Sequence, residues 1–263
     1  MERQRPVTVV TGASSGIGRS LALRLARSGD AVAALARRKP LLDEVVHDIE
    51  TAGGRAIAVA CDVTDRASVF AAIREVERTL GPVDRLVANA GGGERTYVDS
   101  FSAAQIERAL ALNVGGAATC IEAVLPGMLA RGSGHLVATG SLAGRRGLPN
   151  AAAYGAAKAA LSNMMESLRI ELRPRGIAVT VIDPGFVRLS SRKKPRPFQI
   201  ELEPATRLMH RAIIERRAAC AFPLALVLLT GLARHLPAGL YDRVMLDRIR
   251  QMPEGKRRPD GAG

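Results

Sequence analysis

The stretch TGASSGIGRS, residues 11–20, decides how the fold begins. It joins the β-branched run VTVVT (7–11) to a run with the spacing and composition of a helix, and it is rich in glycine. Glycine accepts backbone conformations that other residues avoid, so we expect a sharp turn from strand to helix here. The free N–H groups and the positive dipole end at such a helix start favour a phosphate or pyrophosphate.

The glycines of this turn fall as G-x-x-x-G-x-G, at Gly12, Gly16 and Gly18. We expect Gly12 to permit the turn, Gly16 to let the backbone approach a ligand, and Gly18 to let the helix pack closely on the strand. Ile17 and Arg19 stand where a Walker A loop has its second glycine and its lysine, so a P-loop is excluded. A tight turn without a ligand remains the alternative for this stretch alone.

Short apolar runs alternate with helical stretches after this turn. These runs are VTVVT (7–11), AVAALA (31–36), AIAVAC (56–61), RLVANA (85–90), HLVATG (135–140) and IAVTVID (177–183). Continuous apolar strands indicate burial on both faces, and alternation with helices predicts parallel pairing through right-handed crossovers. The sequence therefore predicts an α/β fold, a Rossmann-type doubly wound parallel sheet flanked by helices, with ligands at the carboxyl ends of its strands.

The composition suits a globular protein whose positive charge lies mainly in its last third. The chain has 263 residues, 47% of them hydrophobic, and a net charge of +13. Residues 185–263 hold 16 Lys and Arg against 7 Asp and Glu, so they carry +9 of that charge. This asymmetry favours an anionic substrate or an acidic membrane surface, and a solvated basic surface is the alternative. We expect no nucleic-acid binding, because no aromatic residues are interleaved with the basic ones.

The cysteines and histidines form no recognisable site. Cys61, Cys120 and Cys220 are isolated, which predicts buried free thiols, and the four histidines are too scattered to form a metal-ligand pattern. The polar start MERQRPV is no signal peptide, so we expect a cytoplasmic protein without a bound metal.

The end of the second predicted strand, ALARRK (34–39), bears on the choice of nucleotide. In nucleotide-binding folds a carboxylate at this point binds the ribose 2′-hydroxyl, whereas an arginine accommodates a 2′-phosphate. Here Ala36 is followed by Arg37 and Arg38. The sequence therefore favours NADP(H) over NAD(H), with Ser15 and Arg37 as contacts, and a solvated basic loop is the alternative.

Tyr154 and Lys158 lie four residues apart in a helical run and therefore share a helix face. A neighbouring cation favours the phenolate and lowers the pKa of the tyrosine, which suits a proton donor and acceptor. On its own, a tyrosine and a lysine at this spacing on a helix are usually exposed surface residues without a catalytic role.

Three polar residues elsewhere in the sequence change that interpretation of Tyr154 and Lys158. Ser141 follows the fifth strand, Asn89 ends the fourth, and Asn113 interrupts the helical run IERALALNVGGAATC (106–120).

Taken together, these features resemble the short-chain dehydrogenase/reductase family over about residues 6–188. The matching pieces are TGASSGIG (11–18), Asp62-Val63, Asn89-Ala90-Gly91, Asn113, Ser141, Tyr154-x-x-x-Lys158 and Pro184-Gly185, in the family's order and spacing. One departure is visible, because Leu189 stands where many relatives have a threonine that contacts the cofactor.

The resemblance implies a role for each of these residues. Tyr154 would be the general acid/base that protonates the carbonyl oxygen as hydride arrives from the nicotinamide. Lys158 would lower the pKa of Tyr154 and hold the nicotinamide ribose, Ser141 would orient the substrate carbonyl, and Asn113 would anchor a water in the proton relay. The implied cofactor-binding residues are Gly12, Ser14, Ser15, Gly16, Ile17, Gly18, Arg37, Asp62, Val63, Asn89, Ala90, Gly91, Tyr154, Lys158, Pro184, Gly185 and Val187. The substrate would be a small-molecule carbonyl or alcohol, and the assembly a homodimer or homotetramer.

We expect one domain in three parts. Residues 1–190 would form the NADP-binding and catalytic core, 191–252 a substrate loop and C-terminal helical extension, and 253–263 a disordered tail. The segment 187–204 is basic and contains prolines, so we expect it to be mobile. Helical stretches are expected near 204–217 and 238–252.

The apolar stretch AFPLALVLLTGLA (221–233) is too short to span a bilayer, for which about 20 residues are needed. We expect a core or dimer-facing helix. The alternative is a helix that lies on an anionic membrane, flanked by Arg216, Arg217 and Arg234, which would suit a lipophilic substrate. A regulatory nucleotide-binding protein of the same fold is a further alternative, against which the intact serine, tyrosine and lysine argue.

Overall fold

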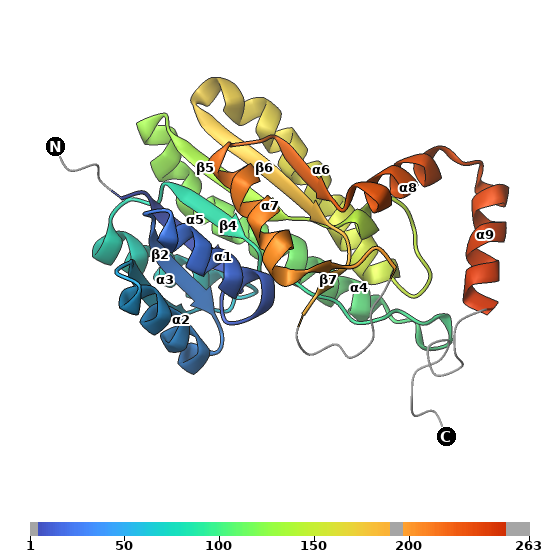
Figure 1. Cartoon of the computed structure of the whole chain (residues 1–263), viewed down its shortest axis with the longest axis horizontal. Helices are drawn as coiled ribbons and strands as arrows, with labels where there is room; N and C mark the ends of the chain where they lie inside the picture. Colours follow the sequence, from blue (N-terminus) through green and yellow to red (C-terminus); the bar gives the residue numbers. More distant parts are fainter. Residues whose placement is uncertain (1–4, 190–196, 251–263) are drawn as a thin grey trace.

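The computed structural model describes residues 5–189 and 197–250. Its centre is a parallel sheet, part of which is labelled in Figure 1, and the strand order is β3-β2-β1-β4-β5-β6-β9. These strands are β1 (Val7–Thr11), β2 (Ala31–Ala36), β3 (Arg55–Ala60), β4 (Arg85–Ala88), β5 (Gly134–Thr139), β6 (Ile177–Pro184) and β9 (Ala219–Phe222). The predicted doubly wound α/β sheet is confirmed, and its strand order reverses between β1 and β4.

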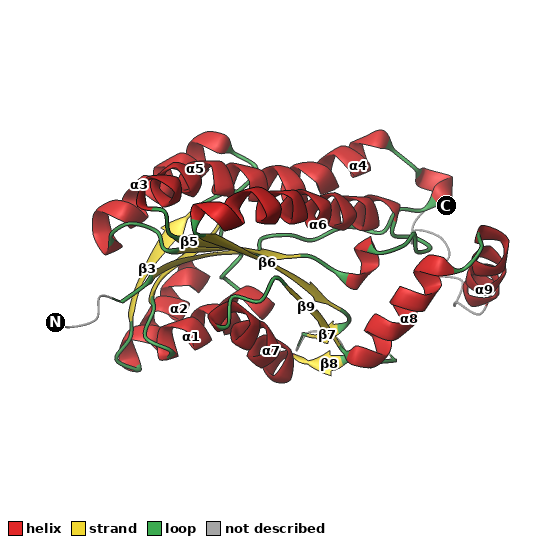
Figure 2. Cartoon of the chain, turned by 90° about the horizontal axis from the view of Figure 1, so that it is seen from above, coloured by secondary structure: helices red, strands yellow, loops and turns green. Residues whose placement is uncertain are grey.

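Helices cover both faces of the sheet, as Figure 2 shows. One face carries α1 (Gly16–Arg27), α2 (Lys39–Thr51) and α7 (Leu202–Ile214). The other face carries α3 (Arg66–Leu80), α4 (Ala103–Leu110), α5 (Gly116–Arg131) and α6 (Ala152–Leu172). Short turns are η1 (Val98–Ser100), η3 (Leu142–Gly144) and η4 (Arg173–Arg175), and the π-helical turn η2 (Ala111–Gly115) joins α4 to α5.

The central strands are largely buried on both faces because their side chains alternate between two apolar layers, whereas the edge strands β3 and β9 are partly exposed. Val9 and Leu86 point into the layer beneath α3, α5 and α6, whereas Val10 and Val87 point into the layer beneath α1, α2 and α7. The helical run 103–131 is long and apolar enough to cross a membrane by length and composition alone. Its buried side chains pack into the first of these layers, as expected of a core helix.

A buried polar cluster crosses the sheet at the amino ends of its strands. Asp30 accepts hydrogen bonds from the hydroxyl of Thr8, at 2.6 Å, and from the guanidinium of Arg85. Arg85 Nε also lies 3.4 Å from His135 Nδ1, and His135 Nε2 lies 2.8 Å from the hydroxyl of Thr180. A guanidinium can only donate, so His135 accepts at Nδ1 and carries its proton on Nε2.

The chain beyond β6 completes the body and then leaves it. The short strands β7 (Val187–Arg188) and β8 (Ile200–Glu201) pair with each other, α7 packs against α1, and β9 extends the sheet. Helices α8 (Leu224–His235) and α9 (Ala238–Arg250) then reach away from the body, as Figure 1 shows. The part of the predicted mobile segment at 190–196 and the predicted tail at 253–263 lie outside the described residues.

Of the expected core or dimer-facing helix at 221–233, the core alternative is wrong. Residues 221–222 belong to β9, and no residue of α8 is buried. Leu224, Leu228 and Leu232 are 70%, 64% and 69% exposed. Helix α8 packs with only one side against β9 and the turn η3, and Leu226 contacts Gly185, so the opposite side of the helix is left exposed.

Contacts of Tyr241 and Arg146 join these two helices to the loop that follows Ser141. The buried Tyr241 of α9 donates a hydrogen bond from its hydroxyl to the carbonyl oxygen of Gly147. The guanidinium of Arg146 lies 4.0 Å from the centroid of the Tyr241 ring. Arg146 also donates a 2.9 Å hydrogen bond to the carbonyl oxygen of Leu236, between α8 and α9. We call α8 and α9 the C-terminal arm.

Candidate active site

The glycine turn has the geometry that its sequence predicts. Gly12 and Gly16 have φ angles of +67° and +54°, which L-residues with side chains rarely adopt. A Cβ atom added at Gly18 would lie 2.2 Å from the carbonyl oxygen of Gly12, so only glycine lets α1 pack this closely on β1. Ser15 precedes α1 without capping it, and no acidic residue lies in the first turn. The N–H groups of this turn therefore face no competing side-chain anion.

The side chain of Arg38 lies against the glycine turn. Its Nη2 atom donates hydrogen bonds of 2.9 Å to the hydroxyl of Ser14 and of 3.0 Å to that of Ser15. Arg37, the arginine that the sequence favoured, lies 4.0 Å from Asp62 instead, with its side chain 79% exposed. The signal for Arg38 was the pair of arginines that directly follows β2, but a pair does not reveal which member faces the turn.

Asn89 joins the carboxyl ends of three strands at the point where the strand order reverses. Its Nδ2 atom donates a 3.1 Å hydrogen bond to the carbonyl oxygen of Thr11 on β1. Its Oδ1 atom accepts a 3.2 Å hydrogen bond from the hydroxyl of Thr139 on β5. The Thr11 hydroxyl in turn accepts from the backbone N–H groups of Asn89 and Ala90. Asn89 thus holds the edge at which ligands of such sheets bind.

Asn113 lies in the π-helical turn between α4 and α5, where it is 1% exposed. Its Nδ2 atom donates to the carbonyl oxygens of Gly92, at 2.7 Å, and Ala109, at 2.9 Å. Its Oδ1 atom accepts a 3.2 Å hydrogen bond from the N–H group of Gly92. A Cβ atom at Gly91 would lie 2.7 Å from Asn113 Oδ1 and 3.1 Å from Lys158 Nζ. Glycine at this position therefore brings Asn113 and Lys158 to one place.

Ser141, Tyr154 and Lys158 also come together there. The hydroxyl groups of Tyr154 and Ser141 form a hydrogen bond. Lys158 Nζ donates a 2.7 Å hydrogen bond to the carbonyl oxygen of Thr139 and lies 5.8 Å from the centroid of the Tyr154 ring. The serine lies just beyond β5, while the tyrosine and lysine share one face of α6, so the predicted set is assembled by adjacent elements.

Burial dominates the electrostatics of this set. It lowers the pKa of Lys158 to about 8, and the nearby carboxylate of Asp183 opposes that change. Burial raises the pKa of Tyr154, and the hydrogen bond with Ser141 opposes it. Lys158 is not among the groups that shift the pKa of Tyr154 in this arrangement. The physical reason is that the ammonium group is directed at the carbonyl oxygen of Thr139.

The loop that follows β6 returns to the glycine turn. The backbone N–H group of Gly185 donates a 2.7 Å hydrogen bond to the carbonyl oxygen of Phe222 on β9. The side chain of Leu189 reaches Gly16, where a Cβ atom would lie 3.3 Å from its Cδ2 atom. Leu189, the departure from the family's threonine, is thus an apolar contact to the turn.

Asp183, which directly precedes Pro184 and Gly185, was not singled out in the sequence. Its carboxylate accepts a hydrogen bond from the backbone N–H group of Ser141. The signal was an acidic residue at the end of an otherwise apolar strand.

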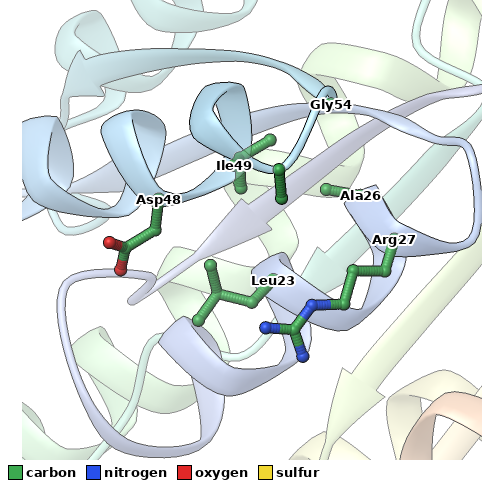
Figure 3. A pocket seen from close by; sticks show the side chains of 7 residues that line it. Leu23, Ala26, Arg27, Asp48, Ile49 and Gly54 are labelled. Atoms are coloured by element: carbon green, nitrogen blue, oxygen red, sulfur yellow. The ribbon is translucent and has the colours of Figure 1, made fainter.

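Two cavities lie at different places relative to Ser141, Tyr154 and Lys158. The one in Figure 3 lies between α1 and α2, has a volume of about 20 Å³ and is too small for an organic substrate. The other, of about 370 Å³, lies between the segment after Ser141 and α6. Its lining residues are Ala143, Gly144, Arg146, Gly147, Leu148, Ala151, Ala152, Gly155, Ala156 and Ala159.

A doubly wound sheet with a glycine turn, and with serine, tyrosine and lysine at its carboxyl edge, defines a nucleotide-binding oxidoreductase. The family model described as short chain dehydrogenase matches residues 6–199. An uncharacterised oxidoreductase of Myxococcus xanthus is 43% identical over 89% of this chain and 94% of its own length. The chain belongs to the short-chain dehydrogenase/reductase family, whose members bind a nicotinamide cofactor, NAD or NADP, and act on small-molecule substrates.

Solved structures agree with this assignment. A 3-ketoacyl-ACP reductase from Sinorhizobium meliloti superimposes with a TM-score of 0.77 and 30% identity, over 85% of this chain and all of the other. An alcohol dehydrogenase from the archaeon Thermococcus sibiricus, complexed with 5-hydroxy-NADP, gives a TM-score of 0.75 and 25% identity, over 83% of this chain and 96% of the other.

Proposed function

We propose that this protein is an NADP(H)-dependent carbonyl reductase or alcohol dehydrogenase that uses Tyr154 as its acid/base. The observation that carries the proposal is the meeting of Ser141, Tyr154 and Lys158 beside the end of β5. Residues 1–190 would bind the cofactor and carry the catalytic residues, and 191–252 would shape the substrate site.

The chain's own residues suit a dinucleotide phosphate. Gly12 and Gly16 open the turn, and the uncapped N–H groups that begin α1 can donate to a pyrophosphate. Arg38 beside Ser14 and Ser15, with Arg37 nearby, offers positive charge for a 2′-phosphate. Asp62 and Val63 follow β3 at the same sheet edge, where the adenine would lie. The alcohol dehydrogenase relative named with 5-hydroxy-NADP supports this choice of cofactor.

When bound, NADPH supplies a hydride to the carbonyl carbon of the substrate. The Ser141 hydroxyl donates a hydrogen bond to the carbonyl oxygen and polarises it, and the Tyr154 phenol delivers the proton to that oxygen. Lys158, held by Thr139, keeps its ammonium group near Tyr154, and Asn113 fixes the adjoining backbone at Gly92. Alcohol oxidation uses the same groups with Tyr154 as the base.

A lipophilic carbonyl or secondary alcohol is the substrate class that we favour. The C-terminal arm, which is clasped to the loop after Ser141, exposes leucine side chains next to this part of the molecule. The similar solved structure named as a 3-ketoacyl-ACP reductase supports a carbonyl on an acyl chain as the substrate. A screen of fatty ketones, sterols, quinones and sugars, following the absorbance of NADPH or NADH, tests this. Fastest turnover of fatty or sterol ketones with NADPH is expected, and turnover of sugars alone would contradict the substrate class.

A second proposal, supported by the arm, is that the protein is cytoplasmic and binds to the surface of anionic membranes. Leu224, Leu228 and Leu232 form an exposed apolar line on α8, and Arg234 in the last turn of the same helix is exposed. Apolar side chains beside basic ones are typical of helices at anionic lipid surfaces. Sedimentation with vesicles containing phosphatidylserine should remove the wild-type protein from solution, and neutral vesicles should not. Absence of binding to both kinds of vesicle would dismiss the proposal.

A homodimer or homotetramer is also part of the proposal, since the arm offers a surface for a second copy. Light scattering after size-exclusion chromatography should give a mass of two or four chains. A monomer at every concentration would contradict it.

A further inference from the structure

Asp183 is partly buried at the end of β6, with its side chain 18% exposed. Three groups from distant parts of the sequence face its carboxylate. The backbone N–H group of Ser141 donates a hydrogen bond to it. Ser162 Oγ lies 3.5 Å from Oδ1, and Arg145 Nη2 lies 3.9 Å from Oδ2. A carboxylate held this way touches the backbone of the serine that would polarise the substrate.

The residue before Ser141 is shaped to admit this carboxylate. A Cβ atom at Gly140 would lie 2.1 Å from Asp183 Oδ1 and 3.0 Å from Ser162 Oγ. Gly140 also donates a 2.7 Å hydrogen bond from its N–H group to the carbonyl oxygen of Ile182, one residue before Asp183. The ends of β5 and β6 are therefore built around the Asp183 carboxylate, and any side chain at Gly140 would displace it.

Helix α6 connects the carboxylate to the acid/base pair. Tyr154, Lys158 and Ser162 follow one another at four-residue spacing, so they lie along one face of α6. Their contacts follow the same order, because Tyr154 meets Ser141, Lys158 meets the end of β5, and Ser162 meets Asp183.

The charge of Asp183 acts on both members of the pair. The titratable and charged groups that face it are Arg145 from the segment after β5, Tyr154 and Lys158 from α6, and Cys220 from β9. Its negative charge raises the pKa of Tyr154 and that of Lys158, while burial lowers the latter. Arg145 offsets this charge only in part, because 3.9 Å is too long for a hydrogen bond.

We propose that Asp183 is a positioning residue that holds the backbone of Ser141 and sets the pH at which Tyr154 and Lys158 exchange the catalytic proton. This inference rests on the proposed oxidoreductase function.

The substitution Asp183→Asn tests the charge, because an amide oxygen can still accept from the Ser141 N–H group. We expect the pH limb of kcat to move to lower pH by about one unit, in reduction and in oxidation alike. Asp183→Ala also removes the acceptor, so we expect the same displacement with kcat about tenfold lower than for Asp183→Asn. Asp84→Asn, which removes an exposed carboxylate that precedes β4, is the matched control and should leave the limb in place.

Arg145→Gln provides a second variant should Asp183→Asn fail to fold. It removes the partial counter-charge from a position that is 26% exposed, so the limb should move to higher pH. An unmoved limb in a folded Asp183→Asn enzyme, or in Arg145→Gln, would overturn the inference while leaving the proposed function intact. A folded wild-type protein without any carbonyl or alcohol turnover would instead contradict the proposed function, and this inference with it.

Discussion

Arg38 donates a 3.0 Å hydrogen bond from its guanidinium to the hydroxyl of Ser15, the residue that precedes helix α1. This contact sets a positive charge against the glycine turn, where a phosphate group of the cofactor is expected. Arg37 instead stands near Asp62 and is largely exposed. The two neighbouring arginines therefore separate into an inner one at the turn and an outer one at the surface.

We expect wild-type protein to bind NADPH at least tenfold more tightly than NADH. Arg38→Gln should weaken NADPH binding by about 10- to 100-fold, because it removes charged hydrogen bonds, and should change NADH binding less. Arg37→Asp should lower the preference for NADPH by repelling the 2′-phosphate. Calorimetric titration measures both, with Arg27→Gln at the far end of α1 as the control. An unchanged ratio of the two Kd values in both variants would contradict the assignment of these arginines.

Gly18 should tolerate no side chain. An alanine Cβ would lie 2.2 Å from the carbonyl oxygen of Gly12 and 2.7 Å from Asn89 Nδ2, so α1 would have to move off the sheet. We expect Gly18→Ala to lower the free energy of unfolding by about 1–3 kcal/mol and to weaken cofactor binding.

The matched substitution is Gly231→Ala in α8, where an added Cβ meets no atom within 4 Å. It should be neutral or stabilising by up to about 1 kcal/mol, because alanine favours helix. Both values come from denaturant unfolding curves. Equal stabilities for the two variants would be incompatible with the tight packing of α1.

His135 should make the protein sensitive to acid. Burial lowers its pKa to about 3, against 6.5 in the unfolded chain. The folded pKa is the lower one, so the unfolded state binds more protons between these values, and stability falls as the pH drops below 6.5. The slope from this residue is at most about 1.4 kcal/mol per pH unit.

We therefore expect His135→Gln to lose less stability than wild type between pH 7 and pH 5, although it is weaker at pH 7 because contacts to Arg85 and Thr180 change. His47→Gln, at an exposed position of α2, should follow the wild-type curve. Urea unfolding at several pH values measures this. Parallel curves for wild type and His135→Gln would rule out a buried neutral histidine.

The first six strands could be predicted because each is an apolar run bounded by glycine or polar residues, and all of them except the edge strand β3 are largely buried. Strand β9 could not, since ACAF is short, half-exposed and continues into the apolar sequence of α8. Apolar composition also failed to distinguish a core helix from an exposed one at α8. That distinction depends on whether the sheet has surface left to cover, which is a property of the assembled layers.

The candidate site likewise contains some residues that the sequence could bring together and others that it could not. Ser141, Tyr154 and Lys158 lie in short motifs with fixed spacing, so the sequence could bring them together. Asp183 and Arg145 are far apart in the sequence and meet only through the register of β5 and β6. Likewise, the backbone course after β2, rather than residue type, decides that Arg38 and not Arg37 faces Ser15.

Tyr154→Phe tests the central claim most directly. It removes only the phenolic oxygen, whereas Tyr97→Phe makes the same change at a tyrosine whose hydroxyl is exposed and accepts a 3.4 Å hydrogen bond from Arg95. We expect Tyr154→Phe to lower kcat by about 100- to 10,000-fold on the best substrate of the screen, with an unchanged Kd for NADPH. Tyr97→Phe should keep wild-type turnover. Wild-type turnover by Tyr154→Phe would contradict the account.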